Sequence, residues 1–404
     1  MITQSVVLRG IRFVLDRGTP RLLVNAILWV AAQRAASSVR MPVSVGPVLA
    51  VARQPNEWRA IREAAASLGS QCSTIAIAQS TWLGASAGPR SHLHSARRVM
   101  PRLLRIARGV LRSHGAFHAV RSLELGVFYC SFRVLVESPA VRAVLISTHS
   151  NPHGLALYAA ARSVGLPVAL ATHGMPIVPL APLDYDAALM ECQDSVECYL
   201  REGCLVRHVM IRGRKDAWAG LSEIPRQRPI AVGVFLSKDP VPEVIERIVK
   251  WLVAETGIRA VLVRPHPVNL WHGMERHLSA IRSTKLRLVI DGDLEETLAE
   301  CDLAIASNST IHVDALLAGV PSGYLAGGDH APFDVQGFVS GGLVWQCPVE
   351  ADRLDLEQVR SFYGRPEWTE RLRRFANIDE READVVTKFG YALARLIARE
   401  RMHA

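Results

Sequence analysis

The chain has 404 residues, of which 49% are hydrophobic and 21% charged, so it can bury one large core or two and is not a disordered or fibrous protein. Its formal net charge of +9 favours acidic partners. No stretch reaches the roughly 18 apolar residues of a membrane span, and the longest N-terminal candidate, 22-LLVNAILWVAA-32, lacks the flanks of a cleavable signal. We therefore expect a cytoplasmic protein.

The seven cysteines predict neither a disulfide framework nor a metal site. Cys192, Cys198 and Cys204 recur every six residues, a spacing that fits neither zinc ligands nor a redox pair. We expect free thiols. The acidic stretch 291-DGD-293 is interpreted as a turn before a helix, so that neither a metal nor a bound cofactor is required.

The first half of the chain alternates apolar strands with helices. This pattern, joined by short loops that contain glycine, is typical of parallel βαβ units with both sheet faces covered. The expected strands are 46–53, 72–79, 141–148, 166–171 and 186–192, and the expected helices include 55–69 and 154–165.

A basic amphipathic helix is expected within this half, at 97-RRVMPRLLRIARGVLRSHG-115. The stretch contains no acidic residue. Either it is an ordinary solvated helix face, or the positive stripe binds an anionic membrane, a polyanionic acceptor or nucleic acid. At 100° per residue, five arginines fall within an arc of about 120°: Arg98, Arg102, Arg105, Arg108 and Arg112. A weaker N-terminal group comprises Arg9, Arg12, Arg17 and Arg21.

The second half repeats the βαβ pattern after a polar linker, 214–229. Its expected strands are 230–236, 259–264, 286–290, 303–306 and 321–325, and its helices are 241–257, 294–301 and 311–319. We predict an α/β protein of two facing Rossmann-like domains with a C-terminal helical tail. The domains are predicted at 1–213 and 230–366, and the tail at 367–404, packing back on both.

Polar side chains are expected to gather where the strands of the second domain end. Ser237 and Lys238 follow one strand, and 307-SNST-310 follows another. Hydroxyl groups and free backbone N–H groups at such loops bind anions, and a lysine adds charge. Taken alone, a serine here is a helix cap. Together with Arg264 and His266, the side chains of these two loops favour an anion site.

The sequence 264-RPHP-267 ends an apolar strand with two prolines. A proline on each side of His266 restricts the backbone and ends the strand, so the imidazole projects from the carboxyl edge of the sheet. This interpretation assigns His266 to phosphate binding.

These motifs resemble the donor domain of GT-B glycosyltransferases. The pair 264-RPHP-267 and 307-SNSTIHVDALLAGVP-321 is similar to bacterial enzymes with cytidine-activated donors, namely capsule and lipopolysaccharide Kdo transferases, polysialyltransferases and teichoic-acid glycerophosphotransferases. The resemblance implies that the donor's phosphate is held by His266, Ser309 and Thr310, with Ser307 a further candidate. It places Asp314 near the ribose hydroxyls.

The first half carries 171-ATHGMPIVPLAPLDYD-186, similar to the Trp-His-Gly-Thr-Pro stretch of the glycerophosphotransferases. His173 ends a strand, and an imidazole suits removal of a proton from an acceptor hydroxyl group. His173 is the predicted general base, with Asp184 and Asp186 as alternatives. His149 and His153 could bind the acceptor or cap the next helix.

The predicted function is transfer of a sugar from a nucleotide donor, CMP-linked by resemblance, to a surface polysaccharide or glycolipid. The enzyme would lie at the inner face of the bacterial cytoplasmic membrane, bind its anionic surface and not bind nucleic acid. The alternatives are a CDP-glycerol-type glycerophosphotransferase, a GT-B sugar-nucleotide epimerase that turns over the donor alone, and a polyanion-binding protein with no activity. The sugar, the linkage, the stereochemical outcome and the oligomeric state stay open.

Overall fold

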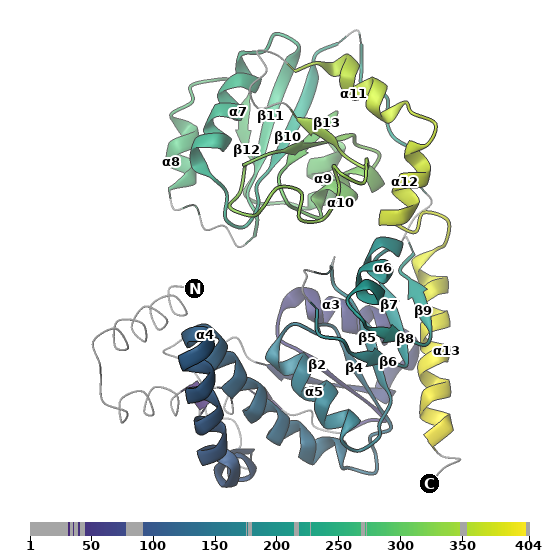
Figure 1. Ribbon diagram of the computed structural model, residues 1–404. Coiled ribbons are helices and arrows are strands. Elements are labelled where there is room, and N and C mark those ends of the chain that lie inside the picture. The colour runs from purple at the N-terminus through teal and green to yellow at the C-terminus, as the bar shows by residue number, and fades with distance from the viewer. Residues whose placement is uncertain are drawn as a thin grey trace, which may run out of the picture. The chain divides into compact units, whose positions relative to one another are not determined.

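The structure is a computed structural model that describes residues 31–32, 35, 39–40, 45–77, 92–174, 176, 180–213, 218–226, 228–267, 271, 273–347 and 354–400. The chain forms two compact units (Figure 1). Unit 1 comprises Met1–Glu191, Ser195–Arg212 and Glu382–Ala404, and unit 2 comprises Cys192–Asp194 and Gly213–Arg381. The segment expected as one tail, 367–404, is therefore divided between the two units after Arg381.

Unit 1 is built around a seven-stranded sheet with the order β1-β3-β2-β4-β5-β7-β9. Every neighbouring pair is parallel except β1 and β3. The strands are β1 (Val39–Arg40), β2 (Val48–Ala52), β3 (Cys72–Ile77), β4 (Ala143–Ile146), β5 (Val168–Ala171), β7 (Ala187–Met190) and β9 (Val209–Ile211). A separate parallel pair is formed by β6 (Asp184–Tyr185) and β8 (Leu205–Val206).

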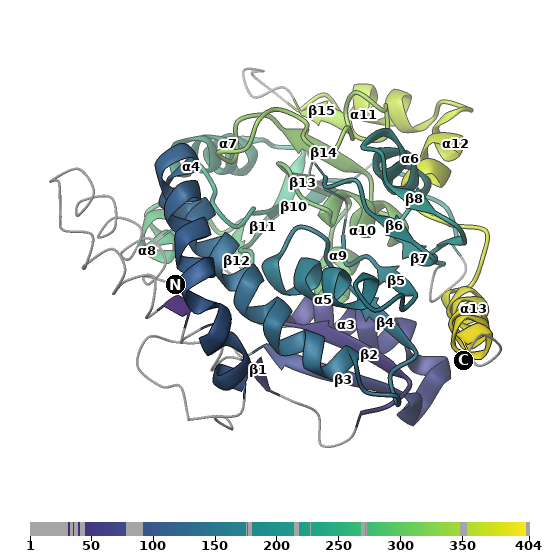
Figure 2. The same ribbon diagram turned by 60° about the horizontal axis from the view of Figure 1, so that its bottom comes forward.

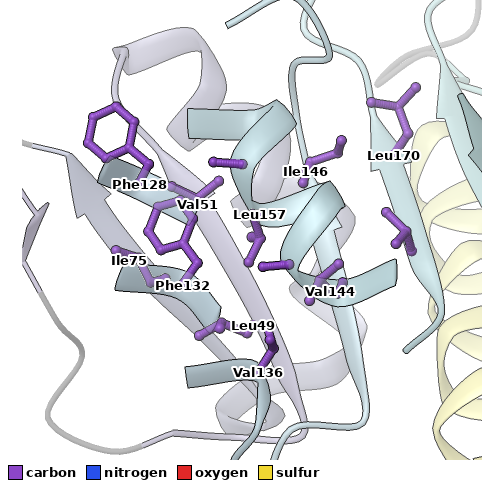
Figure 3. Close-up of a cluster of buried hydrophobic side chains, with 14 of the residues drawn as sticks. Leu49, Val51, Ile75, Phe128, Phe132, Val136, Val144, Ile146, Leu157 and Leu170 are labelled. Carbon is purple, nitrogen blue, oxygen red and sulfur yellow. The ribbon is translucent and has the colours of Figure 1, made fainter. Parts of the chain in front are cut away.

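Helices cover both faces of this sheet, because successive side chains of a strand point to opposite faces. Leu49 and Val51 of β2 pack with Phe128 and Phe132 on one face (Figure 3). Val48, Ala50 and Ala52 pack on the other face with residues of α3 and α13. The helices of unit 1 are α3 (Pro55–Ala64), α4 (His92–Val136), α5 (Pro152–Arg162), α6 (Gln193–Arg201, whose first two residues belong to unit 2) and α13 (Glu382–Glu400), with a 3-10 helix at Ala66–Gln71 (Figure 2).

The predicted basic helix is confirmed as the first arm of α4. Gly115 interrupts this helix with φ 84° and ψ 178°, a conformation that a glycine adopts readily because it has no Cβ atom. The second arm carries the apolar residues that pack on the sheet, among them Leu123, Val127 and Phe128. The two arms thus separate a basic segment from a core segment.

Unit 2 contains a six-stranded sheet with the order β12-β11-β10-β13-β14-β15, and all its pairs are parallel. Numbered within the unit, this order is 3-2-1-4-5-6, that of the Rossmann dinucleotide-binding sheet. The strands are β10 (Ile230–Phe235), β11 (Ile258–Arg264), β12 (Leu286–Leu288), β13 (Leu303–Ala306), β14 (Ser322–Leu325) and β15 (Trp345–Cys347).

The helices of unit 2 also lie on both faces. Side chains of α7 pack with Val232 and Val234, whereas α9 and α10 pack with Ala231 and Phe235 on the other face. The helices are α7 (Pro242–Ala254), α8 (Met274–Ser279), α9 (Leu294–Ala299), α10 (Ile311–Leu317), α11 (Leu356–Tyr363) and α12 (Trp368–Phe375). The five strands and three helices predicted for this half are confirmed, and β15 was not predicted.

Two further expectations concern the chain as a whole. All seven cysteines are free thiols, as predicted. Among the residues that the structure describes, no helix is long and apolar enough to cross a membrane.

Candidate functional site

Two loops of unit 2 flank the point at which its strand order reverses. In an open parallel sheet the ligand crevice lies outside the carboxyl ends of the strands at this switch point. Here the switch point lies between β10 and β13, and the loops that follow these strands begin at Ser237 and Ser307. The predicted anion loops therefore belong to one edge of one sheet.

The loop after β10 presents two groups that the fold does not use. The hydroxyl group of Ser237 is buried and has no hydrogen-bond partner within the described structure, and the side chain of Lys238 is exposed. The end of this loop is held by the loop after β14, because the Val241 N–H donates to the Gly328 carbonyl at 3.0 Å and Pro240 pairs with Asp329. A fixed loop thus carries a hydroxyl group and a cation.

In the serine-rich turn after β13, one hydroxyl group is hydrogen-bonded within the fold and two make few contacts. The buried Ser307 hydroxyl donates to the Leu325 carbonyl at 2.9 Å, and a Cβ atom on Gly328 would collide with it. Ser307 therefore serves the fold. The Ser309 oxygen accepts only a long bond from the Ile311 N–H, 3.3 Å, and Thr310 is exposed with no cap bond from its side chain. The side-chain hydroxyl groups of these two residues are therefore less committed to the fold than that of Ser307.

Two residues that the sequence analysis missed hold this turn. Asn308 donates its side-chain amide to Asp329 at 3.0 Å and to the Pro332 carbonyl at 3.1 Å. The ring of His312 is fully buried, and its Nε2 donates to the Ser307 carbonyl at 2.8 Å while its Nδ1 contacts the Ser322 hydroxyl at 2.7 Å. Burial lowers the pKa of His312 to about 4, so its ring is neutral. Asn308 and His312 were visible in the turn sequence, but Asp329, the partner of Asn308, is 21 residues away.

The strand end 264-RPHP-267 also contains one side chain that is bound within the fold, Arg264, and one candidate ligand residue, His266. The Arg264 guanidinium donates to the Thr297 hydroxyl at 2.8 Å and to the Gly292 carbonyl at 2.7 Å, and so ties β11 to α9. These bonds use Arg264 for the fold, and we do not retain it as a ligand residue. His266 is half-buried beyond the carboxyl end of β11, and Asp314 is exposed on α10.

In unit 1, the histidine predicted as general base lies beyond the carboxyl end of β5. The Nδ1 atom of His173 lies 2.7 Å from the Ser147 carbonyl oxygen. A carbonyl can only accept a hydrogen bond, so Nδ1 carries the proton and Nε2 of the neutral ring keeps its lone pair. This tautomer is the one that a general base requires.

A second imidazole stands beside it on the neighbouring strand end. His149 is buried, and its Nδ1 lies 2.6 Å from the hydroxyl group of Tyr199. Burial, together with the nearby His173, lowers the pKa of His149 to about 4, so this ring is neutral near pH 7. The Nε2 atom of His149 and the hydroxyl group of Ser147 are buried without a hydrogen-bond partner in the described structure.

His153 belongs to a separate buried hydrogen-bonded pair at the switch point of unit 1, between β2 and β4. Glu57 and His153 are both 0% exposed, and His153 Nε2 donates to Glu57 at 3.1 Å. Glu57 also accepts bonds from the N–H groups of Arg53 and Gln54 and from Asn151. The network joins the first turns of α3 and α5, so His153 is structural.

Asp184 and Asp186 lie at the wrong edge of the sheet for a base that works beside His173. Asp186 accepts the Val168 N–H at 2.9 Å, at the start of β5, and pairs with Arg162 at 2.8 Å and with Arg207 at 3.6 Å. Since β5 has four residues, this edge is about 13 Å from the carboxyl edge. Both aspartates precede the strand β7 instead of following one, and this corrects their interpretation as alternative bases.

The described arginines in the first arm of α4, before Gly115, form a surface stripe without acidic partners among the described residues. Arg102, Arg105 and Arg112 are exposed, and Arg108 bonds to the Leu104 carbonyl of its own helix at 3.3 Å. Ile106, which is 50% exposed, adds an apolar side chain to the same arm. Arg98 lies in α4 but its side chain is outside the described structure, as are Arg9, Arg12, Arg17 and Arg21 altogether.

No group of three or more acidic, cysteine or histidine side chains suited to a metal ion occurs in the described part of the chain.

Comparison with known proteins shows a fold and no family. No protein-family model and no curated protein matches the sequence. CalG4, the calicheamicin glycosyltransferase, is similar over 88% of this chain and 99% of its own, with a TM-score of 0.51 and 10% identity. The UDP-GlcNAc 2-epimerase from Neisseria meningitidis, bound to UDP-GlcNAc, covers 86% and 99% with a TM-score of 0.50 and 11% identity. The predicted fold, two α/β domains of the GT-B type with a helical C-terminal segment, is confirmed.

Proposed function

We propose that the protein is a nucleotide-sugar-dependent glycosyltransferase. Unit 2 binds the nucleotide of the donor, and unit 1 supplies the base that activates the acceptor. The observation that carries the proposal is the set of polar groups left uncommitted at the switch point of unit 2: Ser237, Lys238, Ser309 and Thr310. A phosphate group matches them, because hydroxyl groups and a lysine stabilise its charge.

The chemistry assigned to this arrangement is direct displacement. His173 Nε2 takes the proton of the acceptor hydroxyl, whose oxygen forms a bond to the anomeric carbon as the bond from that carbon to the phosphate oxygen breaks. The negative charge of the leaving nucleotide is stabilised by Lys238, by His266 and by the hydroxyl groups of Ser309 and Thr310. The proton passes from His173 to solvent after transfer.

The donor is proposed to be CMP-linked, such as CMP-Kdo or CMP-sialic acid, because the motifs around His266 and Ser309 resemble those of enzymes with cytidine-activated donors. The acceptor is proposed to be a surface polysaccharide or glycolipid. The arginines of α4 with the exposed Ile106 fit an anionic membrane surface, where such acceptors are assembled. A peripheral position at the inner face of the bacterial membrane follows from that proposal.

Two rival activities share the same groups. CDP-glycerol-type glycerophosphotransfer uses a cytidine donor with a different reactive centre. A GT-B epimerase uses a UDP-sugar, as the Neisseria meningitidis enzyme of similar fold is seen with UDP-GlcNAc. An epimerase turns over its donor without an acceptor, which separates it from a transferase.

The test is a donor panel in which the purified chain is incubated with CMP-Kdo, CMP-sialic acid, CDP-glycerol and UDP-GlcNAc, with and without extracted bacterial glycolipid. We expect release of CMP that depends on the glycolipid. His173→Gln should reduce transfer by at least about 10²-fold and leave nucleotide binding intact, whereas His266→Ala should weaken nucleotide binding. Unchanged transfer in both variants would exclude this site, and turnover of UDP-GlcNAc alone would favour the epimerase.

A further inference from the structure

Arg212 collects more ionic contacts than any other side chain of unit 1 that the structure describes. It follows β9, and its side chain is 12% exposed. Its guanidinium lies 2.5 Å from Glu63 of α3, 3.5 Å from Glu191 after β7 and 3.3 Å from Glu382, the first residue of α13. Burial alone lowers the pKa of Arg212, but the three carboxylates raise it above its ordinary value, so the group is charged.

The same guanidinium reaches the residue before the proposed general base. Its Nη2 atom donates to the Thr172 carbonyl at 3.3 Å. Because a peptide bond is planar, that carbonyl lies in one plane with the N–H of His173. A group that holds the carbonyl therefore restricts the orientation of the His173 backbone.

His173 is consequently held at two points. Its ring donates to Ser147 at 2.7 Å, and its backbone is fixed through Thr172, whose N–H and hydroxyl both donate to the Leu189 carbonyl, at 3.0 and 3.3 Å. The bond from Arg212 is the contact that ties this peptide to a charged group instead of to the neighbouring strand. A displacement of Arg212 would thus act on the direction in which His173 presents Nε2.

The position of Arg212 in the chain adds a second consequence. Arg212 is the last residue of unit 1 before the chain enters unit 2 at Gly213, and Glu382 is the first residue after it returns. The residues on either side of the segment 213–381 are therefore joined by one ion pair. The guanidinium that contacts Thr172 therefore lies where both connecting segments meet unit 1.

We propose that Arg212 is a positioning residue for His173, linking it through Thr172 to the start of α13. This inference rests on the proposed function of His173 as general base. A lysine does not replace the arginine, because a single ammonium group cannot reach the carboxylates and the carbonyl in the planar fork geometry of a guanidinium.

Arg162 offers a matched control in the same unit. It also pairs with a carboxylate, Asp186 at 2.8 Å, and also donates to a backbone carbonyl, that of Asp184 at 2.5 Å. It lies at the amino edge of the sheet, away from His173. Arg162→Met should therefore cost stability without acting on the base.

The experiment records ring resonances of the full chain labelled with ¹⁵N histidine, with His173 assigned by its loss in His173→Gln. Arg212→Met and Arg212→Lys should shift or broaden the His173 signals and leave those of His312 in unit 2 unchanged. Arg162→Met should change neither. Glu382→Gln is a milder substitution because it keeps the Arg212 guanidinium, and it should shift the His173 signals in the same direction. It replaces Arg212→Met in this experiment if that variant does not fold.

Unchanged His173 signals in Glu382→Gln and Arg212→Lys would overturn the proposal. For transfer to the glycolipid, Arg212→Lys should lower kcat by up to about 10²-fold, the cost of a small misplacement of a reacting group, with the KM for the donor unchanged. If His173→Gln retains full transfer, the proposed function fails on its own, whereas the resonance shifts still decide whether Arg212 positions that ring.

Discussion

Glu57 shows how burial and hydrogen bonds compete over a single carboxyl group. Burial in the first turn of α3 on its own raises the pKa of Glu57, but the hydrogen bond and charge of His153 and the N–H groups of Arg53 and Gln54 lower it to about 2. Its value is therefore below that of the unfolded chain. The ionised form of Glu57 accordingly stabilises the fold.

The predicted consequence is a stability difference that depends on pH. Replacing Glu57 by Gln should lower the free energy of unfolding by about 3 kcal/mol at pH 7, the equivalent of the shift from 4.5 to about 2. The contribution is complete above about pH 4.5 and is lost as the pH falls toward 2, so the gap between wild type and Glu57→Gln should narrow over that window. Urea unfolding at pH 7, 4 and 3 measures it, and a constant gap would contradict the assignment.

Single residues could be assigned from sequence only as far as their own strand end. The sequence showed that His173 follows a strand. It also showed that His266 lies between two prolines that restrict its backbone. The hydrogen-bond partners were not evident from the sequence, because Ser147 is 26 residues from His173 and Asp329 is 21 residues from Asn308. For the same reason Ser307 and Arg264 were expected to bind ligand, although their bonds belong to the fold.

At the scale of the element, α4 combines two functions that its sequence separates at Gly115. The arm before Gly115 presents the arginine stripe, and the arm after it packs on the sheet. The predicted period of the first arm is observed: Met100 and Ala107 are buried, whereas Arg102 and Arg105 are exposed. A basic exposed face of this kind is attracted to an anionic lipid surface.

We predict that Arg102, Arg105 and Arg112 bind anionic lipid. Their combined replacement by Glu should reduce co-sedimentation with vesicles of phosphatidylglycerol and phosphatidylcholine, since each basic residue near such a surface contributes about 1 kcal/mol. The same charge change at Arg247, Arg276 and Arg282, exposed residues of unit 2, is the control. Equal loss in both triple variants would show a nonspecific charge effect, and no loss would exclude the stripe.

Helices and strands were predicted best from the sequence where the apolar pattern and the flanking turn residues indicated the same boundaries. Five of the six strands of unit 2, β10 to β14, are found where they were expected, because most of them are apolar runs bounded by turn residues. Short strands such as β6, β8 and β15 have two or three residues and no period to detect. Asp184 and Asp186 were named as alternative bases, and the register of β7 with β5 shows that Asp186 lies at the amino edge of the sheet.

For the whole molecule, the order of strands in unit 2 carries the functional argument. The order places the loops after β10 and β13 together, although about 70 residues of chain separate Ser237 from Ser307. Neither periodicity nor motif spacing determines the order of strands in a sheet. The sequence therefore supported only a resemblance to GT-B donor domains, and the structure was needed to locate the switch point. The division of the expected tail at Arg381 likewise depends on contacts between distant segments.

The central claim is that unit 2 binds a nucleotide through the loops at this edge, and thermal unfolding of the full chain with mono- and diphosphates of cytidine, uridine, guanosine and adenosine tests it most directly. A ligand that binds only the folded state must raise Tm. We predict a rise with cytidine monophosphate in the wild type that is lost in His266→Ala. No rise with any nucleotide, or an equal rise in both proteins, would contradict the account.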